Sequence, residues 1–346
     1  MTFNFGLQLL IDFLAPHFVD KIGYRISICM AHICAAAGLI ALTFLPECLP
    51  DPFTGLMLAV IIYAIGGGLL EVLVSPIVEA CPTDNKEAAM SLLHSFYCWR
   101  HVGVVLVSTL FFSVAGITHW RILAILWAMI PLGNAYIFTK VPIASLMEEG
   151  ESSLTIGELL KNRIFWVMAL LMVCAGASEQ AVSQWASALA EEGLGLSKTI
   201  GDLAGSMLFA ILMGLSRMLN GILGESEKME KTMVASGCLC ITSYLIIAWS
   251  AIPIFALVGC GLCGFSVGVL WPGTFSLAAA SIEKGGTAMF AYLALAGDLG
   301  CSLGPTVVGR VSGIANDNLK IGISAAVVFP VILVAGTLFR NKCKVE

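Results

Sequence analysis

Long apolar stretches separated by short polar turns run through the whole chain. A helix needs about 20 mostly apolar residues to cross the hydrocarbon layer of a bilayer. Eleven segments qualify by this measure, and they are residues 2–18, 26–46, 56–80, 90–114, 121–139, 163–189, 203–223, 232–250, 253–281, 287–313 and 320–339. The alternation typical of membrane barrel strands is absent from the sequence. Because backbone groups in lipid have to bond within their own segment, we expect helices.

One polar segment, residues 140–163, divides the predicted spans into five before it and six after it. The pattern predicts an N-terminal helical bundle over residues 1–140, a cytoplasmic linker over 141–162 and a C-terminal six-helix bundle over 163–346. Twelve spans would divide evenly into two bundles. We therefore expect that the chain begins at what would be the second helix of a twelve-helix arrangement, with the first helix missing.

The composition is that of a multi-pass membrane protein. Hydrophobic residues make up 58% of the chain and charged residues 12%, and the mean hydropathy is +0.93. A soluble domain is about 25% charged.

No basic cluster is present, so a nucleic-acid partner is excluded. Metal-ligand spacing, a nucleophile elbow and cofactor motifs are also missing from the sequence, so we expect no enzyme, no metal site and no cofactor.

Basic residues are distributed unevenly between alternate loops. Of the 18 Lys and Arg residues, twelve fall on one side of the predicted spans, three on the other side and three inside spans. Cytoplasmic loops carry the excess of positive charge. We therefore expect residues 20–25, the linker and the C-terminus in the cytoplasm, and the chain in the plasma membrane.

Glycines recur at a spacing of four residues within three of the predicted spans. The pairs are Gly264 and Gly268, Gly300 and Gly304, and Gly309 and Gly313. Such pairs allow two helix backbones to approach closely. We expect them to pack helices inside a monomer, and a dimer interface is the alternative.

The loop of residues 20–25 reads DKIGYR between two apolar spans. This acidic-basic-x-Gly-x-basic pattern resembles the signature loop of the major facilitator superfamily. The resemblance implies an all-α, two-bundle membrane transporter with about eleven transmembrane helices, twelve minus the first. It also implies that Asp20 and Arg25 act as gating residues of an alternating-access cycle. A simple turn with snorkelling charges is the alternative.

Further stretches resemble the fucose–proton symporter family. Residues 66–71 (GGGLLE), followed by Ser75 and Pro76, are similar to its fourth helix, and residues 264–277 to its tenth. Residues 93–96 (LHSF) lie where such permeases open the fifth helix. The resemblance implies proton-coupled sugar transport. Arg100 is a departure, since relatives usually carry a small residue there.

Ionisable residues inside a span mark candidate functional positions. Glu71, Arg100, Trp271 and Asp298 all lie about 14–16 Å from the cytoplasmic edge, near the middle of the hydrocarbon layer. Low dielectric favours the protonated form of a carboxyl group, so Glu71 and Asp298 are the expected proton-coupling residues. A static ion pair with Arg100 is the alternative for Glu71, and an interhelical hydrogen bond is the alternative for Asp298.

Polar side chains one helical turn apart predict a cavity-lining face on the sixth span. Amides, carboxylates and an aromatic platform suit the hydroxyl groups of a sugar. The expected substrate-binding residues are Asn4, Gln8, Glu71, His94, Glu179, Gln180, Gln184, Trp185 and Trp271. A packing role is the alternative for His94. Arg217 lies where the second bundle would repeat the gating loop, so we expect gating, with snorkelling as the alternative.

These patterns favour a secondary active transporter of a small polar solute, a sugar, coupled to protons. Its partners would be the bilayer, the solute and the proton. Two other functions stay open. An exporter of amphiphilic compounds requires a mostly aromatic and aliphatic cavity, and a truncated, non-transporting membrane protein or receptor would bind a solute without moving it.

Overall fold

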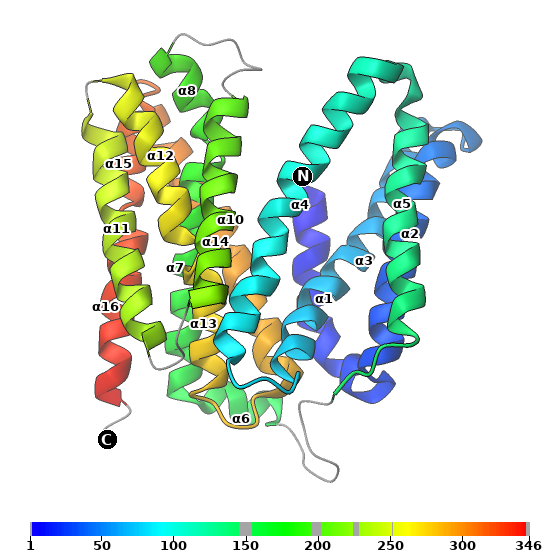
Figure 1. Cartoon of the computed structure of the whole chain (residues 1–346), viewed down its shortest axis with the longest axis horizontal. Helices are drawn as coiled ribbons and strands as arrows, with labels where there is room; N and C mark the ends of the chain where they lie inside the picture. Colours follow the sequence, from blue (N-terminus) through cyan, green and yellow to red (C-terminus); the bar gives the residue numbers. More distant parts are fainter. Residues whose placement is uncertain (1, 145–153, 195–201, 224–227, 251, 344–346) are drawn as a thin grey trace. The chain divides into compact units, whose positions relative to one another are not determined.

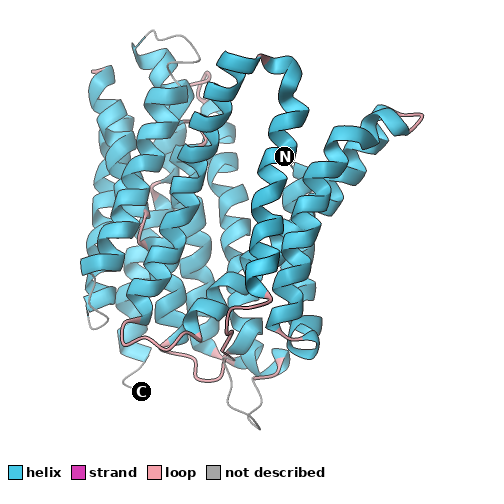
Figure 2. Ribbon diagram, turned by 45° about the vertical axis from the view of Figure 1, so that its right-hand side comes forward, coloured by secondary structure: helices cyan, strands magenta, loops and turns pink. Residues whose placement is uncertain are grey.

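The computed structural model describes residues 2–144, 154–194, 202–223, 228–250 and 252–343. All regular secondary structure in these ranges is helical (Figure 1). The same helices are shown from a second side in Figure 2. They group into two compact units, unit 1 and unit 2, and each is described by itself.

Unit 1 comprises Met1–Pro82, Gly103–Ser153 and Lys284–Leu295. Its complete helices are α1 (Thr2–Ile22), α2 (Tyr24–Cys48), α3 (Pro52–Glu79), the 3₁₀ turn η1 (Ile117–His119) and α5 (Trp120–Phe138). It also contains the second part of α4 (Lys86–Ala115) and the first part of α14 (Gly286–Ile314). Helix α3 packs against α1 and α2, and α2 also packs against α5. Apolar side chains of α1, α2 and α3, together with Ala291 of α14, form its buried core.

Unit 2 comprises Thr83–Val102, Leu154–Glu283 and Ala296–Glu346. Its complete helices are α6 (Ile156–Lys161), α7 (Arg163–Ser183), α8 (Ala186–Leu194), the π-helical turn η2 (Asp202–Met207), α10 (Leu208–Leu223), α11 (Met229–Trp249), α12 (Pro253–Val267), α13 (Leu270–Ala279), α15 (Leu319–Ala326) and α16 (Val328–Cys343). The first part of α4 and the second part of α14 complete it. Helix α7 packs against α13 and α16, and α12 packs against α10 and α11.

The predicted membrane spans are present as helices. Among the described residues, ten helical segments are long and apolar enough to cross a membrane, and their ends lie within four residues of ten predicted spans. The remaining predicted span, residues 2–18, is helix α1. The prediction of an all-α polytopic fold is therefore confirmed.

Two spans that were expected to be continuous are interrupted. The span 163–189 divides at residues 184–185 into α7 and α8, and the span 253–281 divides at residues 268–269 into α12 and α13. The second interruption has a local cause. Pro272 has no N–H, so it cannot bond the carbonyl group four residues earlier in the helix.

Glycines allow α14 to lie directly against α7 inside unit 2. A Cβ atom on Gly300 would overlap the carbonyl group of Val173, and a Cβ atom on Gly304 would overlap that of Ala177. The glycine pair near the end of α12 approaches the backbone of α10 in the same way. These two glycine pairs therefore serve packing within one unit.

Asp51 caps the N-terminus of α3, outside the apolar part of the helix. Its carboxylate accepts hydrogen bonds from Thr54 Oγ1 (2.6 Å), from the Thr54 N–H (3.0 Å) and from the Phe53 N–H (3.2 Å). These bonds, that of the Thr54 hydroxyl first, hold the pKa of Asp51 below its usual value. The cap therefore stabilises α3 above the usual pKa of an aspartate, and this stabilisation is lost as the pH falls through the lowered pKa.

Substitution of Gly300 by Ala should destabilise the protein, because the new methyl group would displace the backbone of α7. Overpacking of this kind costs about 1–3 kcal/mol. Gly313→Ala is the matched control on the same helix, since a Cβ atom there meets no atom within 4 Å. Thermal unfolding of both variants in detergent, followed by tryptophan fluorescence, measures the difference. Equal melting temperatures would contradict the close contact of α14 with α7.

Candidate functional site

An ion pair between Arg217 of α10 and Glu179 of α7 lies buried inside unit 2. Arg217 Nη2 donates to Glu179 Oε2 over 3.0 Å, and the two residues are 3% and 7% exposed. Two charges removed from water are tolerated only when they are paired and their other polar atoms are bonded. The snorkelling alternative for Arg217 is wrong, because its guanidinium points to a buried carboxylate and not to an aqueous surface.

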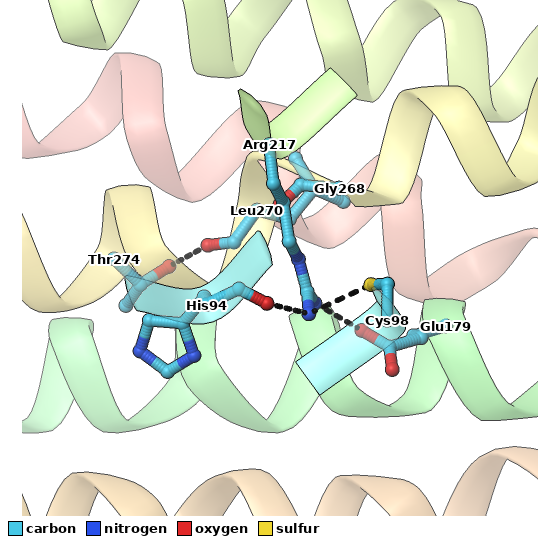
Figure 3. Close-up of polar contacts among 7 residues, drawn as sticks. All are labelled: His94, Cys98, Glu179, Arg217, Gly268, Leu270 and Thr274. Atoms are coloured by element: carbon cyan, nitrogen blue, oxygen red, sulfur yellow. Dashed lines mark hydrogen bonds and ion pairs between the residues drawn. The ribbon is translucent and has the colours of Figure 1, made fainter. Parts of the chain in front are cut away.

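The other N–H groups of Arg217 bind two further parts of unit 2. Nε donates to the carbonyl oxygen of Gly268 over 2.9 Å, at the junction of α12 and α13. Nη1 donates to the carbonyl oxygen of His94 in α4 over 3.0 Å and lies 3.5 Å from Cys98 Sγ. These groups converge on the guanidinium from different helices (Figure 3). One arginine therefore joins α4, α7, α10 and the junction of α12 and α13.

Three rings of unit 2, His94, Phe275 and Trp271, form what we call the aromatic row. The rings of His94 and Phe275 are stacked, with centroids 5.8 Å apart and 24° between their planes. The rings of Phe275 and Trp271 meet edge to face at 6.2 Å and 74°. A Cβ atom on Gly297 of α14 would overlap the indole of Trp271, so this glycine makes room for the ring. Two predicted substrate residues thus meet through Phe275, which the sequence analysis did not single out.

Asp298 follows Gly297 directly and is buried in the second part of α14. It therefore lies one residue from the backbone that contacts Trp271. His94 Nε2 is also buried, and it has no hydrogen-bond partner among the described residues. Roles in proton coupling for Asp298 and in substrate binding for His94 stay predictions.

In unit 1 the predicted residues Gln8 and Glu71 contact each other. Gln8 Nε2 on α1 donates to Glu71 Oε2 on α3. Glu71 is half-buried and lies eight residues before the end of α3, which corresponds to about 12 Å along the helix. The structure also shows a carboxyl group that the sequence analysis missed. Asp12 lies one turn after Gln8 and is 0% exposed, and its spacing of four residues from Gln8 was the signal that could have found it.

The predicted polar face of the sixth span is divided by the end of α7. Glu179 is buried and Gln180 is half-buried, whereas Gln184 is the exposed C-cap of the helix. Trp185 lies in the interruption, with its ring beside Gly309 of α14. Its indole N–H is buried without a hydrogen-bond partner in the part of the chain that the structure describes.

The predicted gating loop connects α1 and α2 through Gly23, whose φ of 91° suits glycine. Arg25 Nη1 donates to the carbonyl oxygen of Phe138 at the end of α5, over 2.8 Å. The side chains of Asp20 and Asn4 lie outside the described residues. Their gating and binding roles stay predictions, as does that of Arg25.

Arg100 lies exposed on α4, with its guanidinium carbon 5.0 Å from the centre of the Tyr97 ring. This is a cation–π contact, which is weak at an exposed site. The pairing of Arg100 with Glu71 stays a prediction. In the described part of unit 2, Arg217 pairs with Glu179 and Arg340 pairs with Glu230.

Each unit offers its own chemical groups. In unit 1, Glu71 places a carboxyl group in a mostly apolar helix bundle. In unit 2, the aromatic row presents flat ring faces, and the N–H groups of Arg217 already donate to protein acceptors. Within the described ranges, no group of three or more His, Cys, Asp or Glu side chains is placed to hold a metal ion.

Breaking the Arg217–Glu179 pair from either side should destabilise the fold, because it leaves one buried charge uncompensated. The single variants Arg217→Met and Glu179→Gln should each lose about 3–5 kcal/mol. The double variant should lose less than the sum, since neither charge remains. Thermal unfolding in detergent tests this cycle, and strictly additive losses would show that the two side chains do not interact.

The sequence profile of the Major Facilitator Superfamily matches residues 1–305. A search of curated protein sequences gives no match. Among solved structures, the E. coli fucose:proton symporter FucP (N162A) is similar, with a TM-score of 0.82, 17% identity and coverage of 98% of this chain and 88% of that one.

Two other solved structures show the same fold. The proton:xylose symporter XylE has a TM-score of 0.79 and 12% identity, and the match covers 98% of this chain and 84% of that one. The human organic anion transporter MFSD10 has a TM-score of 0.78 and 16% identity, and the match covers 96% of this chain and 82% of that one. The profile match covers most of the chain and the similar folds are those of transporters, so this protein belongs to the Major Facilitator Superfamily of membrane transporters.

Proposed function

We propose that this transporter moves a small polar solute, a sugar, across the plasma membrane together with protons. The observation that carries the proposal is the hydrogen bond between Gln8 and Glu71. An amide can donate to a charged carboxylate or accept from a protonated one, so it can accompany Glu71 in both protonation states. The similarity to two structures of proton symporters, FucP and XylE, supports the same coupling.

The aromatic row supports a sugar as the solute. Ligand sites combine apolar and aromatic walls with a few polar groups that fix orientation. Here Trp271 and His94 supply ring faces, and Gln180 and Asp298 supply an amide and a carboxyl group within unit 2. The named substrates of the two similar symporters, fucose and xylose, are both sugars.

Transport in this proposal uses two bundles, residues 1–140 and 163–346, which expose the site to one side of the membrane and then to the other. The linker of residues 141–162 and the C-terminus lie in the cytoplasm because the positive-inside rule favours this orientation. The transporter acts as a monomer, and Arg25 and Asp20 contribute to gating.

Glu71→Gln should abolish sugar accumulation driven by a pH gradient, because an amide cannot carry the coupled proton. Exchange of labelled for unlabelled sugar should persist, since it requires binding without net proton movement. Uptake of L-fucose and D-xylose into proteoliposomes, with and without an inward proton gradient, measures both activities.

Asp51→Asn is the matched control, because it makes the same chemical change on the same helix and Asn also serves as an N-cap. It should leave both activities unchanged. Gradient-driven accumulation by Glu71→Gln at the wild-type rate would remove this residue from the coupling. Sugar binding without any flux in the wild-type protein would instead favour a receptor.

Trp271→Ala should raise the KM for the transported sugar about tenfold, because the loss of an aromatic face removes roughly 1.4 kcal/mol of contact. Trp249→Ala is the control, since Trp249 is 75% exposed at the end of α11. Initial rates of uptake over a range of sugar concentrations separate KM from the maximal rate. An unchanged KM in Trp271→Ala would exclude its indole from the binding site.

A further inference from the structure

The junction of α12 and α13 lacks one backbone-to-backbone hydrogen bond because its sequence contains a proline. In a continuous helix, the carbonyl group of Gly268 would accept the N–H of residue 272, but this residue is a proline and has no N–H. Gly268 is buried, and a buried carbonyl group without a donor costs free energy. Arg217 Nε donates to this carbonyl oxygen over 2.9 Å. The guanidinium therefore replaces the backbone N–H that Pro272 lacks.

The same guanidinium also holds the other end of the aromatic row. Its Nη1 donates to the carbonyl oxygen of His94, whose own ring stacks on Phe275. Its Nη2 bonds Glu179, which neutralises the charge. Figure 3 shows the bonds to His94 and Glu179 leaving a single guanidinium, with the junction at Gly268 beside it. One side chain thus fixes the backbone of His94 and the backbone three residues before Trp271.

We propose that Arg217 is a positioning residue for the solute site. By bonding the carbonyl groups of Gly268 and His94, it sets the direction of the first turn of α13 and thereby the place of the Trp271 indole in the aromatic row. This inference rests on the proposed function, because it takes the aromatic row as the surface that a sugar contacts. Arg217 acts through the backbone and does not itself touch the solute.

Lysine cannot substitute for arginine in this role. A lysine ammonium is a compact charge, whereas the planar guanidinium directs N–H groups to several acceptors at fixed angles. Arg217→Lys therefore keeps a positive charge for Glu179 but cannot bond the carbonyl groups of two helices at once. This separates the positioning role of Arg217 from its role in neutralising a buried carboxylate.

The experiment compares Arg217→Lys with Arg340→Lys. Arg340 is a matched control, because it is also buried in unit 2, 5% exposed, and donates to Glu230 Oε2 and Ser281 Oγ over 3.2 Å each. Fluorine NMR of fluorotryptophan-labelled protein without solute reports the surroundings of Trp271, whose resonance is assigned with Trp271→Phe. This resonance should shift in Arg217→Lys and stay in place in Arg340→Lys. The KM for L-fucose or D-xylose should rise about tenfold in Arg217→Lys alone, with the maximal rate changed less than about twofold.

Pro272→Ala supplies the missing N–H to the carbonyl group of Gly268. It therefore tests whether Arg217 acts on Trp271 through its hydrogen bond to this carbonyl group. In this background Arg217→Lys should change KM less than about threefold, because the carbonyl group now has a backbone donor. The double variant should also fold if Arg217→Lys alone does not. A full tenfold effect in the Pro272→Ala background, or failure of the double variant to fold, would overturn the proposed route.

The two proposals fail in different ways. A Trp271 resonance that stays unchanged in Arg217→Lys, or that shifts equally in Arg340→Lys, overturns the positioning role whatever the transport assay shows. A shifted resonance in Arg217→Lys alone supports the positioning role. If that shift occurs while no sugar is transported by the wild-type protein, the proposed function fails and the positioning of Trp271 stands.

Discussion

A charged arginine inside an apolar helix bundle requires both a counter-charge and acceptors for its N–H groups, and this requirement organises unit 2. Arg217 obtains the charge from Glu179 and its acceptors from two backbone carbonyl groups. One of these carbonyl groups lacks a donor because Pro272 interrupts the helix. A buried guanidinium and a buried carbonyl group without a backbone donor would each cost free energy alone. The hydrogen bond from Arg217 to Gly268 reduces both costs. The combination of the two groups allows a broken helix to persist inside a membrane bundle.

The break has a structural consequence in the first turn of α13. A continuous helix would place Trp271 by its own regular geometry, whereas at the junction its place depends on contacts from α4, α10 and α14. His94 and Gly297 belong to α4 and α14, the two helices that contribute residues to both units. The aromatic row itself lies within unit 2, with His94 on α4 and with Phe275 and Trp271 on α13. Unit 1 has a polar contact of its own, between Gln8 and Glu71.

Much of the fold could be predicted from the sequence, and less of the site. Glu71 and Gln8 were singled out as candidates because a polar residue in an apolar span is conspicuous, and the structure brings the two side chains into contact. Phe275 and Cys98 were not found, because an apolar residue in an apolar span carries no such signal. Asp12 was missed although it lies one turn from Gln8. The snorkelling alternative for Arg217 was inferred from its short distance to a helix end. That distance carries no information about Glu179, the carboxylate on another helix that the guanidinium bonds.

The sequence by itself determined the membrane-spanning helices and the family. Insertion depends on the summed hydropathy of about 20 neighbouring residues, which is a local property. The tertiary structure decided which polar groups meet inside the spans. Arg217 contacts residues that are 38, 51 and 123 positions away, so its partners follow from helix packing and not from local pattern. Water cannot bond a polar group in an apolar layer. Helix packing therefore determines whether an arginine extends to the solvent or finds hydrogen-bond acceptors in the protein interior.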